Sequence, residues 1–597
     1  MRGLAGVAAL GLIVGCFANA SAEVRSISYQ LLLRNAPAQN ADVVMRFQSD
    51  ADTEIRMPVW NALYQVRDFA ENVSDVQVCN AGTCEIARQL SKSSWRVPAH
   101  GAVEVRYRIH LADPGPFGAE LNAEHAFFNF AEVLPYVVGA EHRAPVSVQI
   151  SDVPATWKLA TPLRDGWTLT PPGRTGWILS AKTYDELVDS PTLIGHFDER
   201  HFSEGGKQYR VVVYGAAGSY DIARMTADAQ KLVRAETAMM ADAPFERYTF
   251  LYLVSPEGGG GMEHKYSTAI GLRPMGADYD WLNFDGVTAH EFFHLWNVKR
   301  IRPQTLEPVD YSREQYTRDL WFSEGMTSTM GAYALLKAGL TTPADFDKRL
   351  AATVQDFRSR PAHTWQSPEQ SSLETWYDKY PYYADPERSV SYYTSGELIG
   401  YALDLAIREK TQGKKSVLDL FRYMNQHFAQ AGTFFPEYTG ELQSANAVCR
   451  CDLSDFFAKN VRTAGDLSLE DAMRSVGLLL EKVSVTSSDP GFRWRRNQGR
   501  VLLTTGVNST AYDAGLREED ELLSIAGQAP NRRTLDNLKQ QTAGSKVEVR
   551  VRRSGTELTL SVPLVAKREE QYRLTEAKDA TPEQKARRKA WLAVGIE

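Results

Sequence analysis

Two histidines four residues apart, His290 and His294, could bind one cation together. In an α-helix, residues i and i+4 lie on one face, so both imidazoles can reach the same ion. The intervening Glu291 completes the pattern H-E-x-x-H, in which two His bind Zn²⁺ and the Glu serves as general base. No other pair among the eleven histidines has this spacing. The motif predicts one zinc ion per chain and hydrolytic chemistry.

A catalytic zinc needs a third protein ligand. Residues 320–327 (LWFSEGMT) place Glu324 inside an apolar helical stretch. A carboxylate is costly to bury there without a partner, and a metal would be such a partner. Taken by itself, this segment favours a helix-surface Glu324, but beside the H-E-x-x-H motif Glu324 is the leading ligand candidate.

Four glycines at residues 258–261 precede Met262, Glu263 and His264 and follow a predicted strand. Glycine allows the backbone to approach a ligand closely. Residues 265–272 alternate enough to form an edge strand, which can pair with an extended peptide. Glu263 could then offer its carboxylate to a cationic group such as a peptide α-amine. From its residues alone, the segment is equally compatible with a flexible surface loop.

Tyrosines open a further helix, in residues 391–396 (SYYTSG). A tyrosyl hydroxyl near the metal could donate to a developing oxyanion. Packing is the commoner role for one of 26 tyrosines.

Periodicity divides the chain into regions that position these residues. Residues 26–33, 43–47, 103–109 and 146–150 read as strands of a sandwich-like domain. Two further strands, at 209–214 and 248–254, flank a helix at 225–240, and helices follow at 395–409 and 416–428. Short strands return from about 467 to 564, and Thr581-Pro582-Glu583-Gln584 opens a terminal helix.

The run 288–303 (TAHEFFHLWNVKRIRP) resembles the signature of the glycyl aminopeptidase family, gluzincin zinc peptidases of clan MA with a thermolysin-like catalytic domain. The similarity continues through 258–264 (GGGGMEH), 320–325 (LWFSEG) and 392–408, and it extends over the whole mature chain.

The resemblance implies a role for each matching residue. It implies His290, His294 and Glu324 as zinc ligands and Glu291 as general base. It also implies that Glu263 binds the substrate amine and that Tyr393 stabilises the tetrahedral intermediate. The expected substrate-binding residues are Glu263, Gly260, Gly261, Met262 and His264.

Four residues, at three sites, depart from related patterns. Ser395 stands where Lys is usual, Thr329-Met330 where a Tyr pair is frequent, and His264 where related exopeptidases have Asn. The first two departures concern substrate preference, not the metal site.

The third region resembles a PDZ domain through 509–516 (STAYDAGL) and 520–527 (DELLSIAG). Thr510 replaces the usual Pro, and Glu519 replaces a Gly. Residues 490–492 are a poor match to a carboxylate-binding loop. Capture of a peptide or protein ligand by strand addition and a packing role remain equally open.

The expected fold class is therefore a multi-domain α+β protein with an N-terminal β-sandwich-like domain, a mostly helical thermolysin-like catalytic domain and a C-terminal PDZ-like domain. The expected boundaries are residues 1–22 (signal peptide), 23–198 (β domain), 199–465 (zinc metallopeptidase), 466–566 (PDZ-like) and 567–597 (tail with a helix).

The first residues carry an export signal. Arg2 precedes an apolar run at 4–14, and small-x-small patterns end at Ala20 and Ala22. Residues 13–16 also resemble a lipobox, which leaves lipidation of Cys16 open. The mature protein is expected to be periplasmic or secreted.

A bridge between Cys79 and Cys84 is plausible, whereas Cys449 and Cys451 are either ordinary thiols or a local bridge.

Composition excludes several classes. The 67 basic and 74 acidic residues leave a charge of −7, against the basic excess of a nucleic-acid binder. No later stretch is long and apolar enough for a transmembrane helix. The expected function is an exported zinc aminopeptidase that acts on peptides. The resemblance to the glycyl aminopeptidase family implies a preference for N-terminal Gly or Ala. The alternatives are a zinc endopeptidase and a non-catalytic, PDZ-bearing envelope scaffold.

Overall fold

The computed structural model describes residues 24–594 except 62–63, 81, 99–100, 164–175, 378–387, 498 and 507–508. The expected signal peptide and Cys16 lie outside the described residues. The chain forms two compact units. The first contains the described residues up to Pro343, residues 360–468 and those from Ala586 onward, and the second contains residues 344–359 and 469–585.

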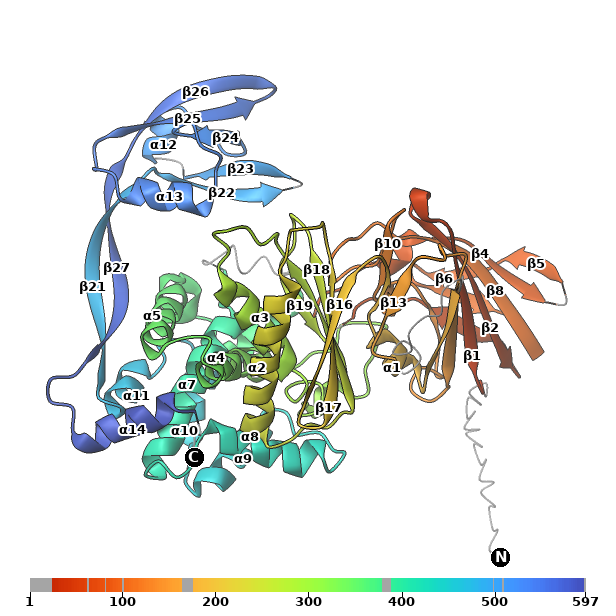
Figure 1. Ribbon diagram of the computed structural model, residues 1–597, viewed down its shortest axis with the longest axis horizontal. Helices are drawn as coiled ribbons and strands as arrows, with labels where there is room; N and C mark the ends of the chain where they lie inside the picture. Colours follow the sequence, from red (N-terminus) through yellow and green to blue (C-terminus); the bar gives the residue numbers. More distant parts are fainter. Residues whose placement is uncertain are drawn as a thin grey trace, which may run out of the picture. The chain divides into compact units, whose positions relative to one another are not determined.

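The N-terminal part of the first unit is β-rich, as the sequence predicts (Figure 1). A seven-stranded sheet has the order β14-β12-β1-β2-β8-β4-β5, and two four-stranded sheets have the orders β13-β15-β10-β9 and β11-β3-β7-β6. The strands are β1 (Ile27–Asn35), β2 (Asn40–Ser49), β3 (Thr53–Arg56), β4 (Val73–Asn80), β5 (Thr83–Ile86), β6 (Arg88–Ser91), β7 (Ser94–Val97), β8 (Gly101–His110), β9 (Glu120–Leu121), β10 (His125–Phe128), β11 (Tyr136–Val137), β12 (Val146–Ser151), β13 (Lys158–Ala160), β14 (Gly176–Ala181) and β15 (Thr192–Gly195).

Alternating burial explains how these sheets pack. In β1 every second side chain from Ile27 to Leu33 is buried, and β2 and β8 show the same period. The buried side chains join those of the two smaller sheets in one apolar core. The short helix α1 (Tyr184–Val188) also contributes to this core, through Tyr184 and Leu187.

A second sheet, with the order β16-β17-β18-β20-β19, begins the part of the same unit that follows the β-rich part. Its strands are β16 (Asp198–Glu204), β17 (Lys207–Tyr214), β18 (Arg247–Val254), β19 (Gly261–Glu263) and β20 (Ser267–Leu272). Strands β17, β18 and β20 are parallel to one another and almost continuously buried. Burial on both faces is typical of parallel strands. Helices α2 (Ile222–Met240) and α3 (Trp281–Phe293) lie along the sheet (Figure 1), and Val212, Leu251 and Ala269 share a core with Phe127 and Leu193 of the β-rich part.

One strand prediction was wrong. Residues 265–272 do not form an edge strand, because β20 lies between β18 and β19. The edge is β19, which carries Gly261, Met262 and Glu263 themselves. The surface that can pair with an extended peptide therefore belongs to the predicted binding residues, not to the segment after them.

Helices build the remainder of the first unit. They are the π-helix η6 (Trp321–Met326), α4 (Thr327–Ala338), α6 (Pro368–Leu373), α7 (Tyr392–Lys410), α8 (Val417–Met424), the π-helix η10 (Asn425–Ala429), α9 (Gly440–Cys449), α10 (Ser454–Phe457) and the π-helix η11 (Ala458–Arg462). Short 3₁₀ turns are η1 (Ala36–Ala38), η2 (Phe69–Asn72), η3 (Phe130–Glu132), η5 (Gln304–Leu306), η7 (Pro361–Thr364) and η8 (Glu374–Tyr377). No helix among the described residues combines the length and the apolar character needed to cross a bilayer.

The second unit holds a five-stranded antiparallel sheet of order β22-β23-β24-β25-β26 around its own apolar core. A long two-stranded ribbon of β21 and β27 belongs to the same unit, and β27 continues across the expected boundary at residue 566. Its elements are α5 (Pro343–Ser359), α11 (Leu469–Ser475), β21 (Leu478–Asp489), β22 (Phe492–Asn497), β23 (Arg500–Thr505), α12 (Thr510–Asp513), β24 (Glu521–Ile525), α13 (Arg532–Lys539), β25 (Lys546–Arg553), β26 (Thr556–Pro563) and β27 (Val565–Glu576).

The predicted terminal helix is confirmed as α14 (Pro582–Leu592). Thr581 Oγ1 accepts from the Gln584 amide at 3.2 Å, and the Gln584 side chain accepts from the Thr581 amide at 2.9 Å, so the capping box is present. Near its end, the buried Trp591 donates its indole N–H to the Tyr333 hydroxyl of α4 at 2.6 Å.

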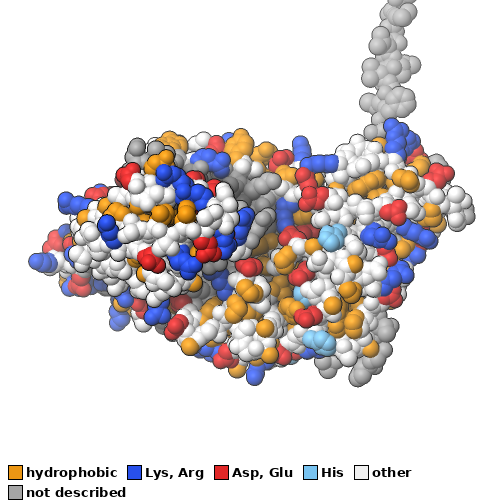
Figure 2. Space-filling view, turned by 90° about the horizontal axis from the view of Figure 1, so that it is seen from above, with side chains coloured by type: hydrophobic (Ala, Val, Ile, Leu, Met, Phe, Trp, Pro, Cys, Tyr) orange, Lys and Arg blue, Asp and Glu red, His pale blue; other side chains and the backbone are white. Residues whose placement is uncertain are grey.

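Acidic and basic side chains are interspersed over the face that Figure 2 presents.

Two disulfides are present among the described residues, Cys79–Cys84 and Cys449–Cys451. The first joins paired residues of β4 and β5, and the second closes a local loop at the end of α9. The bridge expected between Cys79 and Cys84 is thus confirmed, and the choice left open for Cys449 and Cys451 is resolved as a bridge.

Alkylation should label none of these four cysteines in the denatured, unreduced protein, because a bridged sulfur has no thiol. After reduction, peptide mapping should find all four labelled. Labelling of Cys449 or Cys451 before reduction would show that this bridge is absent.

Candidate metal centre and active site

The H-E-x-x-H motif lies at the end of α3, where His290 and His294 present their rings on one face. The His294 amide bonds the His290 carbonyl at 3.3 Å, so the helical geometry continues through the cap. Two of the three residues between them, Phe292 and Phe293, point into the core. Phe292 packs against Tyr248 of β18, and Phe293 packs against Phe421 of α8. Packing on one face of α3 thus turns the histidines toward the site.

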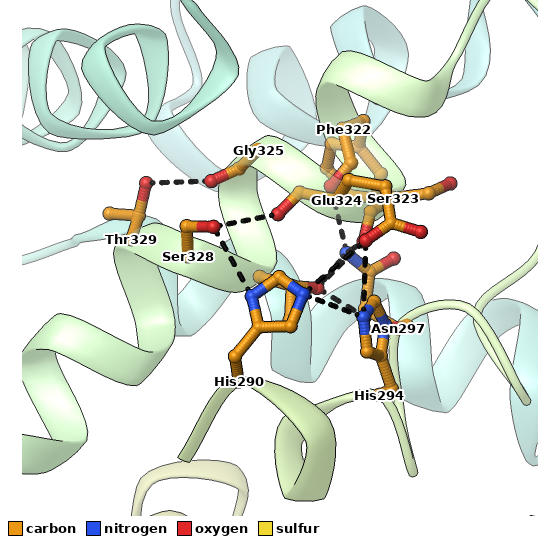
Figure 3. Close-up of polar contacts among 10 residues, drawn as sticks. His290, His294, Asn297, Phe322, Ser323, Glu324, Gly325, Ser328 and Thr329 are labelled. Atoms are coloured by element: carbon orange, nitrogen blue, oxygen red, sulfur yellow. Dashed lines mark hydrogen bonds and ion pairs between the residues drawn. The ribbon is translucent and has the colours of Figure 1, made fainter. Parts of the chain in front are cut away.

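Glu324 completes a three-residue cluster with the two histidines (Figure 3). The Nε2 atoms of His290 and His294 lie 2.9 Å apart, and Glu324 Oε2 lies 3.3 Å and 3.2 Å from them. Ligands about 2.0 Å from a tetrahedral zinc are about 3.3 Å from one another. The three donor atoms therefore fit one zinc ion. Glu324 is only 3% exposed, so the surface alternative for this residue is wrong.

Hydrogen bonds fix the protonation pattern of both rings (Figure 3). His294 Nδ1 donates to the Asn297 carbonyl at 2.6 Å. His290 Nδ1 lies 3.2 Å from Ser328 Oγ, whose hydroxyl donates to the Glu324 carbonyl. In the neutral form of each ring, which is the form that binds a metal, Nδ1 therefore carries the proton and the Nε2 lone pair is left for the ion.

The side chains of His290, His294 and Glu324 shift one another's pKa values. Burial lowers the pKa of His294, but Glu324, Glu263 and Glu291 outweigh it and raise the value to about 10. Burial and the neighbouring His294 lower the pKa of His290. Burial raises the pKa of Glu324, but the two imidazoles more than offset this and lower it below its ordinary value. A divalent cation in their midst would satisfy all three groups at once.

Glu324 reaches the histidines from a π-helix, an element often found at functional sites. Asn297 holds this π-helix in place. Its side-chain amide donates to the Phe322 carbonyl at 2.9 Å and to Thr327 Oγ1 at 3.1 Å. Asn297 therefore supports both His294, through its carbonyl, and the segment of Glu324, through its amide. No local sequence pattern predicted a role for Asn297 or Ser328, although Asn297 lies within residues 288–303 and Ser328 is four residues after Glu324.

Close packing of glycines brings η6 against α7. A Cβ on Gly325 would collide with the Cα of Gly396 and lie 2.6 Å from the Tyr392 carbonyl. A Cβ on Gly400 would collide with Thr329, whose hydroxyl donates to the Glu397 carbonyl at 2.9 Å. Thr329 thus serves this helix contact, where a larger tyrosine would not fit. The same approach places the Tyr393 ring 5.8 Å from the ring of His290.

A second acidic cluster adjoins the first. One ligand atom each of Glu263, Glu291 and His294 lies within 4.8 Å of the others. Burial raises the pKa of Glu291 well above its ordinary value, and Oε2 of Glu291 has no hydrogen-bond partner among the described residues. The carboxylate of Glu263, 6% exposed, likewise makes no hydrogen bond or ion pair with any described residue.

Glycines allow β19 to run beside Glu291. A Cβ on Gly261 would collide with the Glu291 carboxylate, and a Cβ on Gly260 would lie 2.6 Å from the Phe117 ring. Gly260 also has φ +75°, a conformation that favours glycine. Glycine at these two positions therefore permits the close approach of β19 to Glu291 and of Gly260 to Phe117.

Glu263 lines a cavity of about 380 Å³. Met262 and His264 lie in the same wall, and Trp60, Tyr64 and Asp189 come from the β-rich part. Met262 and His264 are each 1% exposed, and His264 Nδ1 faces Asp189 at 3.3 Å. The observed contacts of His264 thus support the strand. The contributions of Asp189, Trp60 and Tyr64 carry no local sequence signal, because they depend on how two domains pack.

Comparisons with known proteins found family models and solved structures to which this chain is similar. The family model of the M61 glycyl aminopeptidase matches residues 283–399, and that of the peptidase M61 N-terminal domain matches residues 28–196. The crystal structure of an aminopeptidase N family protein from Idiomarina loihiensis is 25% identical, with a TM-score of 0.80 over 95% of this chain and 100% of that chain. An M1 zinc metallopeptidase from Deinococcus radiodurans, a mutant bound to a Tyr-Ser-Ala substrate, is 17% identical with a TM-score of 0.43, over 72% of this chain and 91% of that chain. The search of curated proteins found no match.

The substitution Gly325→Ala should lower the free energy of unfolding by about 1–3 kcal/mol, because the added methyl overpacks the contact between η6 and α7. It should also reduce bound metal, since Glu324 would shift with η6. Thermal unfolding and elemental analysis measure the two effects.

Gly286→Ala in α3 is the matched control. Its Cβ would meet nothing within 4 Å, so a gain of up to about 1 kcal/mol in helix propensity is expected with metal binding unchanged. Equal destabilisation by both alanines would rule out the close-packing explanation.

Proposed function

Because this chain belongs to the M61 glycyl aminopeptidase family, we propose that it is an exported, zinc-dependent aminopeptidase that removes small N-terminal residues from peptides. His290, His294 and Glu324 would hold one zinc ion, and the mutual distances of their donor atoms support this assignment. The preference for Gly or Ala is supported by the family resemblance alone.

One observation favours an aminopeptidase over an endopeptidase. The carboxylate of Glu263 is buried, lines a cavity and makes no ion pair with any described residue. Such a group is costly unless a cation pairs with it, and the α-ammonium of a peptide is one. Glu263 lies within 4.8 Å of a ring nitrogen of His294. That span is about one residue, since consecutive Cα atoms are about 3.8 Å apart. A substrate amine held at Glu263 would place the first peptide bond beside the metal ligands.

The proposed mechanism assigns a step to each remaining group. Zinc, when bound, supplies Lewis-acid polarisation of the scissile carbonyl and lowers the pKa of the attacking water. Glu291 takes the proton from that water and passes it to the leaving amine. Its burial and raised pKa suit a group that must accept and then return a proton. The Tyr393 hydroxyl donates to the oxyanion, supported by the position of its ring beside His290.

Strand β19 would bind the substrate backbone. It is the edge of its sheet, with β20 as its ladder partner among the described residues, and its glycines let an extended peptide lie close. Gly260 and Gly261 act here through their lack of a side chain, and Met262 through its burial in the cavity wall.

Export is supported by the signal pattern in residues 1–22 and by two disulfides, which form in oxidising compartments. The location is periplasmic or extracellular, and the mass of the mature N-terminus distinguishes simple cleavage from lipidation at Cys16.

The catalytic part is thermolysin-like in this proposal. The second unit is PDZ-like, with a peptide or protein ligand that would add a strand to its five-stranded sheet.

The variant Glu291→Gln should lower kcat by about 10²–10⁴-fold with zinc retained, because the amide cannot act as a base. Turnover of a glycyl reporter, with and without a chelator, and elemental analysis test this. Glu236→Gln replaces another fully buried helical glutamate and should keep near-wild-type turnover. Near-normal activity of Glu291→Gln would remove the base assignment, and absence of both zinc and turnover in the wild type would favour a scaffold.

The variant Glu263→Ala should lose about 10–10²-fold in kcat/KM on peptides with a free amine, the value of a hydrogen bond to a charged group. The exposed Glu257→Ala, in the same glycine-rich segment, is the matched control and should change little. A panel of free and N-acetylated reporter peptides measures both variants. Equal losses on the two kinds of peptide, or efficient cleavage of blocked peptides by the wild type, would point to an endopeptidase.

A further inference from the structure

The strand that carries Glu263 is weakly held by its own sheet. Strand β19 spans only Gly261–Glu263 and is paired on one side, with β20. The glycines before it add conformational freedom that folding must remove. A three-residue edge strand that follows several glycines frays readily. The position of Glu263 therefore needs support from contacts other than the pairing of β19 with β20.

Asp189 of the β-rich part supplies contacts directly after Glu263. Its Oδ2 accepts from the backbone amide of Lys265 at 2.8 Å, and its Oδ1 faces Nδ1 of His264 at 3.3 Å. These two residues follow Glu263 in the turn to β20, where the His264 amide also bonds the Ser267 carbonyl. Asp189 itself caps the end of α1, where its own amide bonds the Asp185 carbonyl.

A third contact connects Asp189 to the segment that follows the metal-binding helix. Lys299 Nζ lies 2.7 Å from Asp189 Oδ1, and the Lys299 side chain is 12% exposed. Burial raises the pKa of Asp189, but Lys299 and His264 more than offset this and lower it below its ordinary value. At the other end of the strand, Phe117 packs over Gly260. The β-rich part thus contacts β19 on both sides of Glu263.

We propose that Asp189 is a positioning residue for amine recognition: through Lys265, His264 and Lys299 it holds the end of β19 so that Glu263 stays at the distance from the metal ligands that one residue spans. The inference rests on the proposed amine role of Glu263. It makes the N-terminal domain a part of substrate selection, although Asp189 itself binds no substrate.

A double-mutant cycle of Asp189→Ala and Glu263→Ala tests the inference. On a glycyl reporter, Asp189→Ala should lower kcat/KM about tenfold in the wild-type background, mainly through KM. In the Glu263→Ala background, Asp189→Ala should lower kcat/KM less than twofold, because the carboxylate that Asp189 positions is gone. Asp189→Asn, which keeps an acceptor for the Lys265 amide but loses the charge beside Lys299, should fall between. Zinc content should stay unchanged.

Asp185→Asn is the matched control, four residues earlier on α1. Asp185 accepts from the Tyr311 hydroxyl at 2.7 Å and contacts His142, so it also connects the two parts of the unit without contacting the β19 turn. It should stay within twofold of wild type. Equal losses from Asp189→Ala in both backgrounds, or no loss, would overturn the inference alone. If Glu263→Ala shows no selective loss on free amines, the amine role fails and the inference with it.

Discussion

Burial of the Glu324 carboxylate between two imidazoles is the constraint on which the rest of the structure depends. A charge at that depth is tolerable only with partners held at fixed positions. His290 and His294 come from one helix and Glu324 from another, so two helices must be aligned to within a fraction of an ångström. Asn297 joins them through its carbonyl and its side-chain amide, and Gly325 and Gly396 let α7 pack closely against the helix of Glu324. Asn297, Gly325 and Gly396 therefore shape the candidate metal site without being candidate ligands themselves.

The same principle extends outward to the sheet. Glu263 must stand near the metal ligands, yet it lies on a short edge strand beside glycines. The neighbouring domain makes up for this weakness, with Phe117 packed at one end and Asp189 bonded at the other. The N-terminal domain thus contributes to the site through backbone anchoring and cavity walls, which explains why an enzyme with a self-contained metal motif keeps a large β-rich domain packed against it.

Periodicity predicted the elements well where burial is regular. The strands at β1, β2, β8, β17 and β18 and the helices α2, α7 and α14 all fall within a few residues of the expected ranges. The helix expected over 416–428 passes into the π-helix η10 after Met424. The prediction missed this change because one widened turn leaves the spacing of apolar residues almost unchanged. The order of strands was not predictable either: β20 is central and β19 is the edge, because pairing with β18 depends on contacts between segments separated in the chain.

The sequence by itself determined the two histidine ligand candidates and the candidate general base, because H-E-x-x-H needs only the fixed geometry of one helix. Only the tertiary structure decided that Glu324 is buried at that cluster, that Glu263 is a buried carboxylate without a partner among the described residues, and that Asp189 supports its strand. Spacing along a helix is a local property that a sequence carries directly. Convergence of groups from different helices, strands and domains depends on packing over long separations, and no local pattern records it.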